Sequence, residues 1–371
     1  MPARPADTPD SPDRADRQHH ASPQPRQAAQ ADRAAQAAAL FLRTRPLPAR
    51  RAAAAEAGAP PETPTEAPAD EPAGTSADAS PCAESELQCL IRQLQEAEAV
   101  LIGAGAGLST SAGYCYDGPV FEQNFADFIA RYHFTDMYTA GFFRFPSLEE
   151  HWAYWSRHIY LNRYCPIPRA TYASLLKLVE GRDYFVLTTN VDHCFQRAGF
   201  AKERLFYTQG DYGLWQCSVP CQNRTWDNET QVRAMLAQQK DRRIPASLVP
   251  YCPRCGAPMT MNLRADATFV EDEGWYRAQA RYRDFVHRTA GKRLILLELG
   301  VGGNTPGIIK YPFWQMAFRN ARSFLVCLNL HEAFCPPELA GRSLCLAADI
   351  DAVLRALIQR LFRQPAGSGN R

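Results

Sequence analysis

The sequence is short of lysine, of net charge and of long apolar runs. Only 5 of its 41 basic residues are lysines, and none of these precedes Lys177. The formal net charge is +2, so no global field favours nucleic acid or a membrane surface. No apolar run approaches the roughly 18 residues that a membrane-spanning helix needs. We therefore predict a soluble, cytoplasmic protein with no nucleic-acid partner and no membrane partner.

The first part of the chain has little that could form a core. Residues 1–84 are dominated by Ala, Pro, Arg, Asp, Gln and Ser. Such a composition cannot offset the entropy lost on ordering, so we predict a disordered, low-complexity N-terminal tail over 1–84. An organelle transit peptide is the second interpretation, with an organellar location. Acidic residues argue against it, because transit peptides contain few acids: Asp7, Asp10, Asp13 and Asp16.

Residues 85–365 show the pattern of one α/β domain, followed by a flexible C-terminus over 366–371. Apolar strand segments recur, and each runs into a polar or glycine-containing turn and then a helical pattern. This order predicts a Rossmann-like, doubly wound parallel sheet. The expected strands are 99–102, 184–189, 205–208, 294–299, 324–328 and 344–347. Asp349 is the expected N-cap of a closing helix.

An aromatic segment interrupts this pattern at about 119–165. Four of its rings have helical spacing: Phe121, Phe125, Phe128 and Tyr132. We interpret the segment as a helical insert with an aromatic core of its own.

Two closely spaced cysteine pairs predict a metal site. The chain has 12 cysteines, and its length and these pairs favour reduced thiols over disulfides. Cys217 and Cys221 form the first pair, and Cys252 and Cys255 form the second. Four thiolates at this spacing suit a closed, tetrahedral and therefore structural Zn²⁺ site. It would hold a small zinc module of about 212–265 within the sheet domain.

The apolar segment 99–102 leads into the glycine-rich stretch Gly103–Gly113. A strand, a glycine turn and a helix start together favour a phosphate-binding loop, because glycines let backbone N–H groups approach a phosphate closely. Simple turn glycines are the plainer interpretation. Further along, Asn190 and Asp192 follow the strand 184–189, at the edge where open α/β sheets bind ligands. A strand-end turn cap is the plainer interpretation of these two residues.

Taken in order, these motifs resemble the sirtuin family, which comprises NAD-dependent protein deacylases and ADP-ribosyltransferases. The segment Gly105–Ser109 resembles the family's Gly-Ala-Gly-x-Ser loop, with Gly113 in register, and Thr188–Asp192 resembles Thr-Gln-Asn-Ile-Asp. Cys252–Gly256 resembles the second zinc knuckle. Gly300–Asn304 resembles the Gly-Thr-Ser region, and Leu328–Asn329 resembles the strand-end Ile-Asn. The resemblance covers roughly 85–362.

The resemblance implies NAD, consumed as a co-substrate, and a structural Zn²⁺ ion. By the same resemblance, the second Gly-Ala-Gly unit meets the pyrophosphate of NAD. The implied cofactor-binding residues are Gly105, Ala106, Gly107, Ser109, Gly113, Thr189, Asn190, Asp192, Gly300, Asn304 and Asn329. The implied catalytic residues are Asn190, Asp192 and Gln209.

Departures from the family pattern indicate the branch. Gln209 stands where the family has its catalytic histidine, eight residues before Cys217. Thr189 replaces the glutamine of the asparagine motif, and Cys115–Gly118 replaces Pro-Asp-Phe-Arg. This combination resembles the macrodomain-linked (class M) branch. What that resemblance implies is ADP-ribosylation of a lipoylated carrier protein of glycine-cleavage-H type, with a macrodomain hydrolase and a lipoate–protein ligase as partners.

Gln209 also bears on the chemistry. Deacylation needs a base near neutral pH, which a histidine supplies and a glutamine amide cannot. Gln209 can still hydrogen-bond a ribose or position a nucleophile. We therefore predict an NAD-dependent protein ADP-ribosyltransferase. The alternatives are an NAD-dependent lysine deacylase, a non-catalytic NAD-binding module and an NAD hydrolase. His193 is a weaker candidate for a substitute base, because it follows the asparagine motif and its ring could point away from the site.

Overall fold

The computed structural model describes residues 84–303 and 306–362. By its internal contacts the chain separates into units of 1–73 and 74–371, and all described residues belong to the second unit. The predicted N-terminal tail over 1–84 lies outside the described residues, except for Glu84, as do the predicted C-terminal segment 366–371 and the predicted cofactor residue Asn304. No described helix is both long enough and apolar enough to cross a membrane.

The predicted Rossmann-like sheet is confirmed. Six strands, all parallel, lie in the order β3-β2-β1-β7-β8-β9. The chain winds outward from β1 to β3, then returns beside β1 and winds outward again from β7 to β9. The switch point of the sheet lies between β1 and β7, and open sheets of this kind bind ligands beyond the carboxyl ends of the strands at such a point. The strands are β1 (Ala99–Ala104), β2 (Tyr184–Thr188), β3 (Leu205–Tyr207), β7 (Leu294–Leu299), β8 (Phe324–Leu328) and β9 (Ser343–Leu346).

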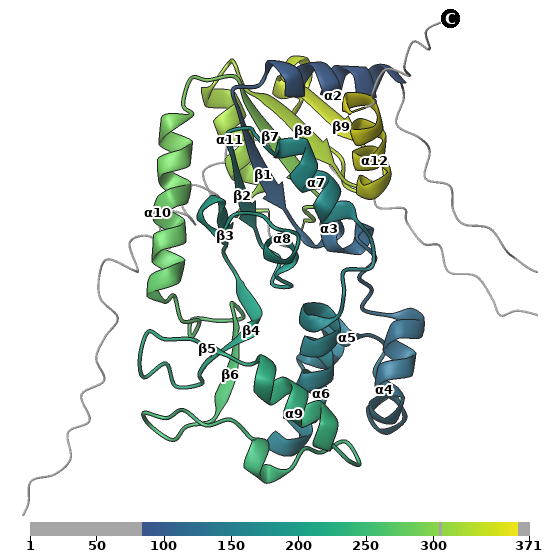
Figure 1. Ribbon diagram of the computed structural model, residues 1–371, viewed down its shortest axis with the longest axis vertical. Coiled ribbons are helices and arrows are strands. Elements are labelled where there is room, and N and C mark those ends of the chain that lie inside the picture. Colours follow the sequence, from purple (N-terminus) through teal and green to yellow (C-terminus); the bar gives the residue numbers. More distant parts are fainter. Residues whose placement is uncertain (1–83, 304–305, 363–371) are drawn as a thin grey trace, which may run out of the picture. The chain divides into compact units, whose positions relative to one another are not determined.

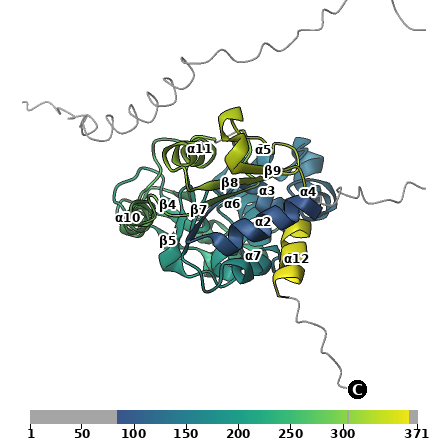
Figure 2. The same ribbon diagram turned by 90° about the horizontal axis from the view of Figure 1, so that it is seen from above.

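Helices cover both faces of this sheet (Figures 1 and 2). One face packs against α2 (Glu84–Glu96), α7 (Thr171–Val179) and α12 (Ile350–Leu361), and the other against α10 (Glu273–Arg288) and α11 (Lys310–Arg319). On β1, Val100 and Ile102 face the first group, whereas Leu101 faces the second. Because both faces are buried, the strands are continuously apolar, which is why the sequence shows them clearly. The predicted N-cap of α12 is confirmed, since Asp349 Oδ1 accepts a hydrogen bond from Ala352 N at 2.9 Å.

A second group of elements forms what we call the small module, residues 118–164 and 210–263. Its antiparallel sheet has the order β5-β4-β6. The strands are β4 (Gly210–Cys217), β5 (Trp226–Asp227) and β6 (Met259–Leu263). The helices are α4 (Gly118–Tyr132), α5 (Met137–Gly141), α6 (Leu148–Ile159), the π-helix η1 (Tyr160–Tyr164), α9 (Glu229–Gln238) and the 3₁₀ helix η3 (Ala246–Leu248).

The helical insert and the zinc-cysteine segment share one hydrophobic core. Phe125 and Trp152 from the first belong to the same buried cluster as Trp215 and Met261 from the second. The ring centroids of Trp152 and Trp215 lie 5.0 Å apart. The two segments are separated in the sequence by β2 and β3, but they pack as a single body.

Short helices complete the chain. They are α3 (Ala106–Ser111), α8 (Cys194–Arg197) and the 3₁₀ helices η2 (Lys202–Arg204) and η4 (Pro337–Arg342).

Candidate active site

The glycine loop joins the two strands at the switch point. It leaves β1 and becomes α3, with Gly105 at the N-cap position. The backbone N–H of Gly105 donates to Leu299 O, and that of Gly107 donates to Gly300 O, both at 3.0 Å. A Cβ on Gly105 would lie 2.6 Å from Gly300 O. These glycines therefore allow direct backbone contact between the β1 and β7 loops, and both of their amides are engaged in it.

Asn190, Ser109 and Asp192 lie together at the end of β2, against the glycine loop. Asn190 Nδ2 donates to Gly105 O at 3.0 Å and to Ser109 Oγ at 3.1 Å. Ser109 Oγ donates to Asp192 Oδ2 and lies 2.9 Å from the hydroxyl of Tyr172. Three residues that the sequence assigned to the site, from segments about 80 positions apart, thus form one network.

Asp192 is the charged residue of this network, and it is only 7% exposed. Burial raises the pKa of its carboxyl above the ordinary value, although hydrogen bonds from Ser109 and from the Cys194 backbone oppose the shift. Burial also raises the pKa of the Tyr172 hydroxyl, so that hydroxyl stays protonated. The network therefore holds a carboxylate that has been removed from water, next to neutral hydrogen-bonding groups.

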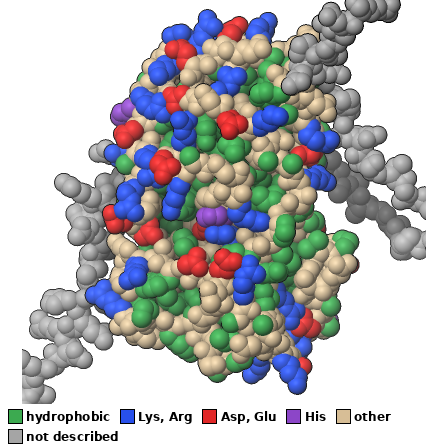
Figure 3. All heavy atoms as spheres, in the orientation of Figure 1, with side chains coloured by type: hydrophobic (Ala, Val, Ile, Leu, Met, Phe, Trp, Pro, Cys, Tyr) green, Lys and Arg blue, Asp and Glu red, His purple; other side chains and the backbone are tan. Residues whose placement is uncertain are grey.

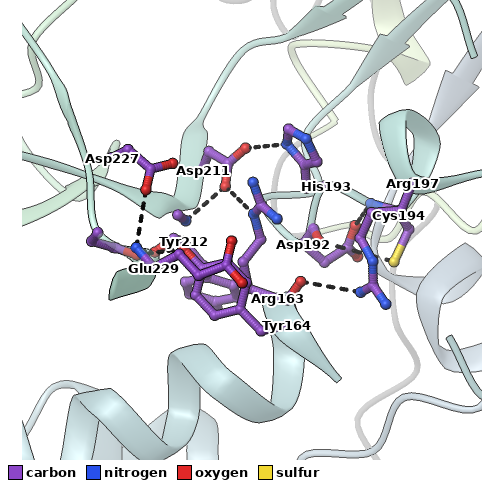
Figure 4. A network of polar contacts seen from close by, with 12 residues as sticks. Arg163, Tyr164, Asp192, His193, Cys194, Arg197, Asp211, Tyr212, Asp227 and Glu229 are labelled. Carbon is purple, nitrogen blue, oxygen red and sulfur yellow. Dashed lines mark hydrogen bonds and ion pairs between the residues drawn. The ribbon is translucent and has the colours of Figure 1, made fainter. Parts of the chain in front are cut away.

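A second polar network adjoins the first (Figure 4). His193 Nδ1 lies 2.5 Å from Asp211 Oδ2, and Arg163 Nε donates to Asp211 Oδ1 at 2.7 Å. Burial alone would raise the pKa of Asp211. The hydrogen bond and charge of His193 and the charge of Arg163 outweigh it, so that the pKa lies below its ordinary value. Asp211 is therefore an ionised group clamped between two basic side chains.

A narrow cavity, with no room for a water molecule in this structure, lies between the two networks. Its lining includes Asn190, Asp192, His193, Tyr207 and Asp211. It lies at the carboxyl end of the sheet, beyond β2 and β3. The imidazole of His193 therefore borders the same cavity as the predicted site residues, and it does not point away from them.

Gln209 lies between β3 and β4 and is half-buried. Its backbone carbonyl accepts a hydrogen bond from Arg264 N at 3.1 Å. The next residue, Gly210, lines the cavity. Gln209 therefore precedes a residue of the cavity lining but is not itself part of that lining.

The other predicted cofactor residues lie around the same strand ends. The backbone N–H of Thr189 donates to Ala104 O at 3.1 Å, which ties the β2 loop to β1. Asn329 Nδ2 donates to Val301 O at 3.2 Å, so the loops after β7 and β8 are also joined. Gly113 lies past the end of α3, where a Cβ would approach Pro168 to 2.8 Å.

The predicted cysteine ligands converge. The Sγ atoms of Cys217, Cys221, Cys252 and Cys255 all lie within 4.8 Å of one another. The Cys217–Cys255 and Cys221–Cys252 pairs are 3.5 and 3.6 Å apart. Four thiolates around Zn²⁺, at Zn–S distances of about 2.3 Å, have S···S separations of about 3.8 Å. The cluster therefore fits one tetrahedral structural zinc ion.

Three residues of this site were missed by the sequence analysis. Tyr172 looks like part of an ordinary apolar helix face. In the sequence, Asp211 follows the predicted strand 205–208 and stands two positions after Gln209. Its place beside a predicted site residue is the signal that could have identified it. Arg163 lies 48 positions before Asp211 in an aromatic segment, where nothing in the sequence marks it.

Comparison with known proteins identifies the family. A protein ADP-ribosyltransferase of Staphylococcus aureus (strain Mu50 / ATCC 700699) is 35% identical over 275 residues, which are 74% of this chain and 87% of that protein. A probable bifunctional ADP-ribose hydrolase/ADP-ribosyltransferase of Fusarium oxysporum f. sp. cubense is 31% identical over 281 residues, which are 72% of this chain and 46% of that protein. No family model matches the chain.

Solved sirtuin structures were also found. One, from work on the structural basis of sirtuin substrate affinity, is 19% identical with a TM-score of 0.46 and covers 75% of this chain and 99% of its own. Another, Sir2 with a p53 peptide and NAD⁺, is 18% identical with the same TM-score and coverage.

The α/β fold and the Staphylococcus relative define an ADP-ribosyl-transferring class of enzyme. Within it, the chain belongs to the family of protein ADP-ribosyltransferases.

Proposed function

We propose that the protein transfers ADP-ribose from NAD to a side chain of a lipoylated carrier protein of glycine-cleavage-H type and releases nicotinamide. The observation that carries the transfer reaction is the relative at 35% identity over most of both chains, named a protein ADP-ribosyltransferase. Gln209 supports transfer over deacylation, because its amide cannot take up the proton that deacylation requires.

The residues around the switch point fit a dinucleotide. The glycine backbones of the β1 and β7 loops meet at the switch point, and Asn190 and Asp192 offer an amide and a carboxylate beside them. We assign NAD binding to Gly105, Ala106, Gly107, Ser109, Gly113, Thr189, Asn190, Asp192, Gly300, Asn304 and Asn329. NAD supplies the ADP-ribosyl group, and nicotinamide is the leaving group.

The chain's own residues then have defined tasks. Asn190 is held by Gly105 O and Ser109, so its amide has one orientation in which to meet a ribose hydroxyl. Ser109 and Tyr172 fix the carboxylate of Asp192, which can accept a hydrogen bond from the amide of nicotinamide. Gln209, which precedes a residue of the cavity lining, positions the incoming nucleophile. Fixing these groups before binding lowers the entropic cost of bringing the reactants together.

An exposed apolar patch supports a protein acceptor. Apolar side chains gather over α4 and α5 (Figure 3), and Tyr138 and Phe142 are 60% and 67% exposed. Met137 N, at the start of α5, donates to Tyr116 O, only a few residues past the glycine loop. Because contiguous exposed apolar patches commonly mark protein contact sites, a folded substrate can dock here, beside the site.

Partners and location complete the proposal. The name of the Fusarium relative pairs an ADP-ribose hydrolase with the transferase, which supports a macrodomain hydrolase as a functional partner. A lipoate–protein ligase would supply the lipoylated carrier. We propose a cytoplasmic location because all the described cysteines are free thiols.

The test is incubation of the full chain with NAD and a purified carrier protein, with and without lipoylation, read by intact mass. We expect the mass of one ADP-ribosyl group on the lipoylated carrier and nicotinamide in the supernatant. Transfer to both carrier forms would refute the requirement for lipoyl. Acyl loss from an acetylated peptide without transfer would favour the deacylase, and nicotinamide release without any acceptor would favour the hydrolase. NAD binding without nicotinamide release would leave only the binding module.

A further inference from the structure

His193 is held in an unusual conformation by the second polar network. Its backbone φ is 64°, in the left-handed region that few residues other than glycine, asparagine, aspartate and histidine adopt. Asp211 Oδ2 contacts the ring at Nδ1. Asp211 Oδ1 in turn accepts hydrogen bonds from Arg163 Nε and from Gly213 N, each at 2.7 Å. An unfavourable backbone conformation that is maintained by buried polar contacts at a cavity is a mark of function.

The network draws on three separate parts of the chain (Figure 4). Arg163 comes from η1, Asp211 from β4, and His193 from the turn before α8. The Asp211 side chain is 4% exposed and that of Arg163 13%, whereas the His193 side chain is 26% exposed. The imidazole is therefore the accessible end of a buried charge network.

The contact between His193 and Asp211 determines which ring nitrogen is available to a ligand. Asp211 is ionised, because its pKa lies below the ordinary value, so it accepts a hydrogen bond and Nδ1 must carry the proton. The protonated ring, whose charge lowers the pKa of Asp211, carries protons on both nitrogens. When the ring loses one proton, Nδ1 keeps the other, and Nε2 becomes an acceptor with a free lone pair. The ring borders the cavity that Asn190 and Asp192 also line.

We propose that His193 is a catalytic residue that accepts a hydrogen bond, and then the proton, from a hydroxyl group of the bound reactants through Nε2. Asp211 and Arg163 are positioning residues that hold the ring. This inference rests on the proposed function, and it concerns a different position from that of Gln209. The hydroxyl belongs either to the ribose of NAD or to the acceptor.

The proton balance is simple. The O–H bond of the substrate hydroxyl breaks, its proton passes to Nε2, and the oxygen keeps the electron pair. The ring then carries protons on both nitrogens, and the carboxylate of Asp211 stabilises that positive charge. The proton leaves to solvent through the exposed part of the ring.

Other titratable groups face the ring from every side. They are Asp211 on β4, Arg163 on η1, Asp192 in the preceding turn, Cys194 on α8 and Tyr207 on β3. Burial raises the pKa of the Tyr207 hydroxyl to about 12 and that of the Cys194 thiol still further, so both stay neutral. The fixed charges of the network are therefore those of Asp211 and Arg163, which have opposite signs, while Asp192 is a carboxyl whose pKa burial raises.

The first test needs no catalysis. Nitrogen-15 NMR of the full chain labelled on histidine reads the tautomer of each ring, and His193→Gln identifies the His193 signals among the eight histidines. We expect the neutral form of the ring to carry its proton on Nδ1 and to have a bare Nε2. A neutral ring with its proton on Nε2 overturns the proposal.

The second test uses rates. Nicotinamide release without acceptor and transfer to the carrier are compared for wild type, His193→Gln, Asp211→Asn and the control His287→Gln, which alters an exposed histidine of α10. We expect His193→Gln to lose about 100-fold or more in transfer, together with the limb of the pH profile on which the rate rises with pH. Asp211→Asn should displace that limb, which a merely structural role would not do.

The same experiment distinguishes a hydroxyl of the NAD ribose from a hydroxyl of the acceptor. If the ribose supplies it, His193→Gln slows nicotinamide release as well, and ADP-ribose alone shifts the His193 signals. If the acceptor supplies it, the loss is confined to transfer. His193→Gln rates equal to those of His287→Gln in both assays overturn the proposal. A wild type that neither releases nicotinamide nor transfers would instead refute the proposed function, and the NMR result still decides the state of the ring.

Discussion

A Cβ on Gly300 would lie 2.5 Å from the backbone carbonyl carbon of Gly107. The two residues are already joined, because Gly107 N donates to Gly300 O at 3.0 Å. Gly300 also has a φ of 60°, which strains any residue with a side chain. The contact between the β1 and β7 loops therefore requires glycine at position 300 for two reasons: a side chain has no space there, and the backbone has a positive φ.

We expect Gly300→Ala to separate the two loops. The change should lower the free energy of unfolding by about 1–3 kcal/mol and weaken NAD binding. Thermal unfolding with and without NAD measures both effects. Gly341→Ala is the matched control, because a Cβ there meets nothing within 4 Å and φ is not positive. Equal melting temperatures for the two variants would contradict the described contact.

Asp192→Asn should abolish activity without lowering stability. Because burial raises the pKa of Asp192 in the folded state, stability is greatest below the ordinary pKa and declines as the pH rises through the folded pKa. A neutral amide removes that decline and keeps an acceptor for Cys194 N. Urea unfolding in acidic and in neutral buffer tests this, with the exposed Asp284→Asn as control. A large loss of stability in neutral buffer would show that the charge is compensated after all.

Removal of the metal should loosen the whole small module. Cys217 and Cys252 belong to the same buried cluster as Trp152 of α6, so loss of zinc from the cluster reaches the helical insert. We expect a strong chelator to release about one zinc ion per chain and to change tryptophan fluorescence, with the same result from Cys252→Ser. Cys89→Ser, outside the cluster, should behave like wild type. If activity vanished while the module stayed folded, a structural role for the zinc would be refuted.

Lys310 and Glu298 form a buried ion pair beneath the β7 loop. Lys310 Nζ lies 2.5 Å from Glu298 Oε1, and the two residues are 1% and 0% exposed. Burial raises the pKa of Glu298 even though the charge of Lys310 opposes the shift. The carboxylate therefore depends on its one basic partner.

Lys310→Met should destabilise the fold by about 3–5 kcal/mol, because it leaves a buried charge unpaired. The loss should be larger in alkaline than in mildly acidic buffer, where Glu298 takes up a proton. The double variant Lys310→Met, Glu298→Gln should recover most of the stability. A double-mutant cycle by urea unfolding measures the coupling, and additive losses would indicate that the two groups do not interact.

The sheet and the zinc ligands could be predicted because local patterns carry them. The strands are apolar on both faces, and the cysteine pairs have ligand spacing. Ser109, Asn190 and Asp192 were predicted together because each belongs to a recognisable motif, and the structure brings them into one network.

The His193 network could not be predicted, because its geometry depends on tertiary packing. Arg163 reaches Asp211 only after the π-helix η1 packs beside β4. The left-handed conformation of His193 has no distinctive sequence signal, because histidine adopts it more often than most residues but only in certain tertiary contexts. The direction of this ring, which decides its chemistry, follows from contacts with residues distant in the chain.

The shared core of the small module also limits which segments of the protein can be deleted without loss of folding. Deleting the helical insert alone would expose Trp215 and Met261, and deleting the cysteine-bearing segment alone would expose Phe125 and Trp152. Either truncation would expose an apolar surface that favours aggregation. A viable minimal version has to lose both segments together, and it would also lose Arg163 and Asp211. Any such shortened protein would retain the parallel sheet but not the residues that orient His193.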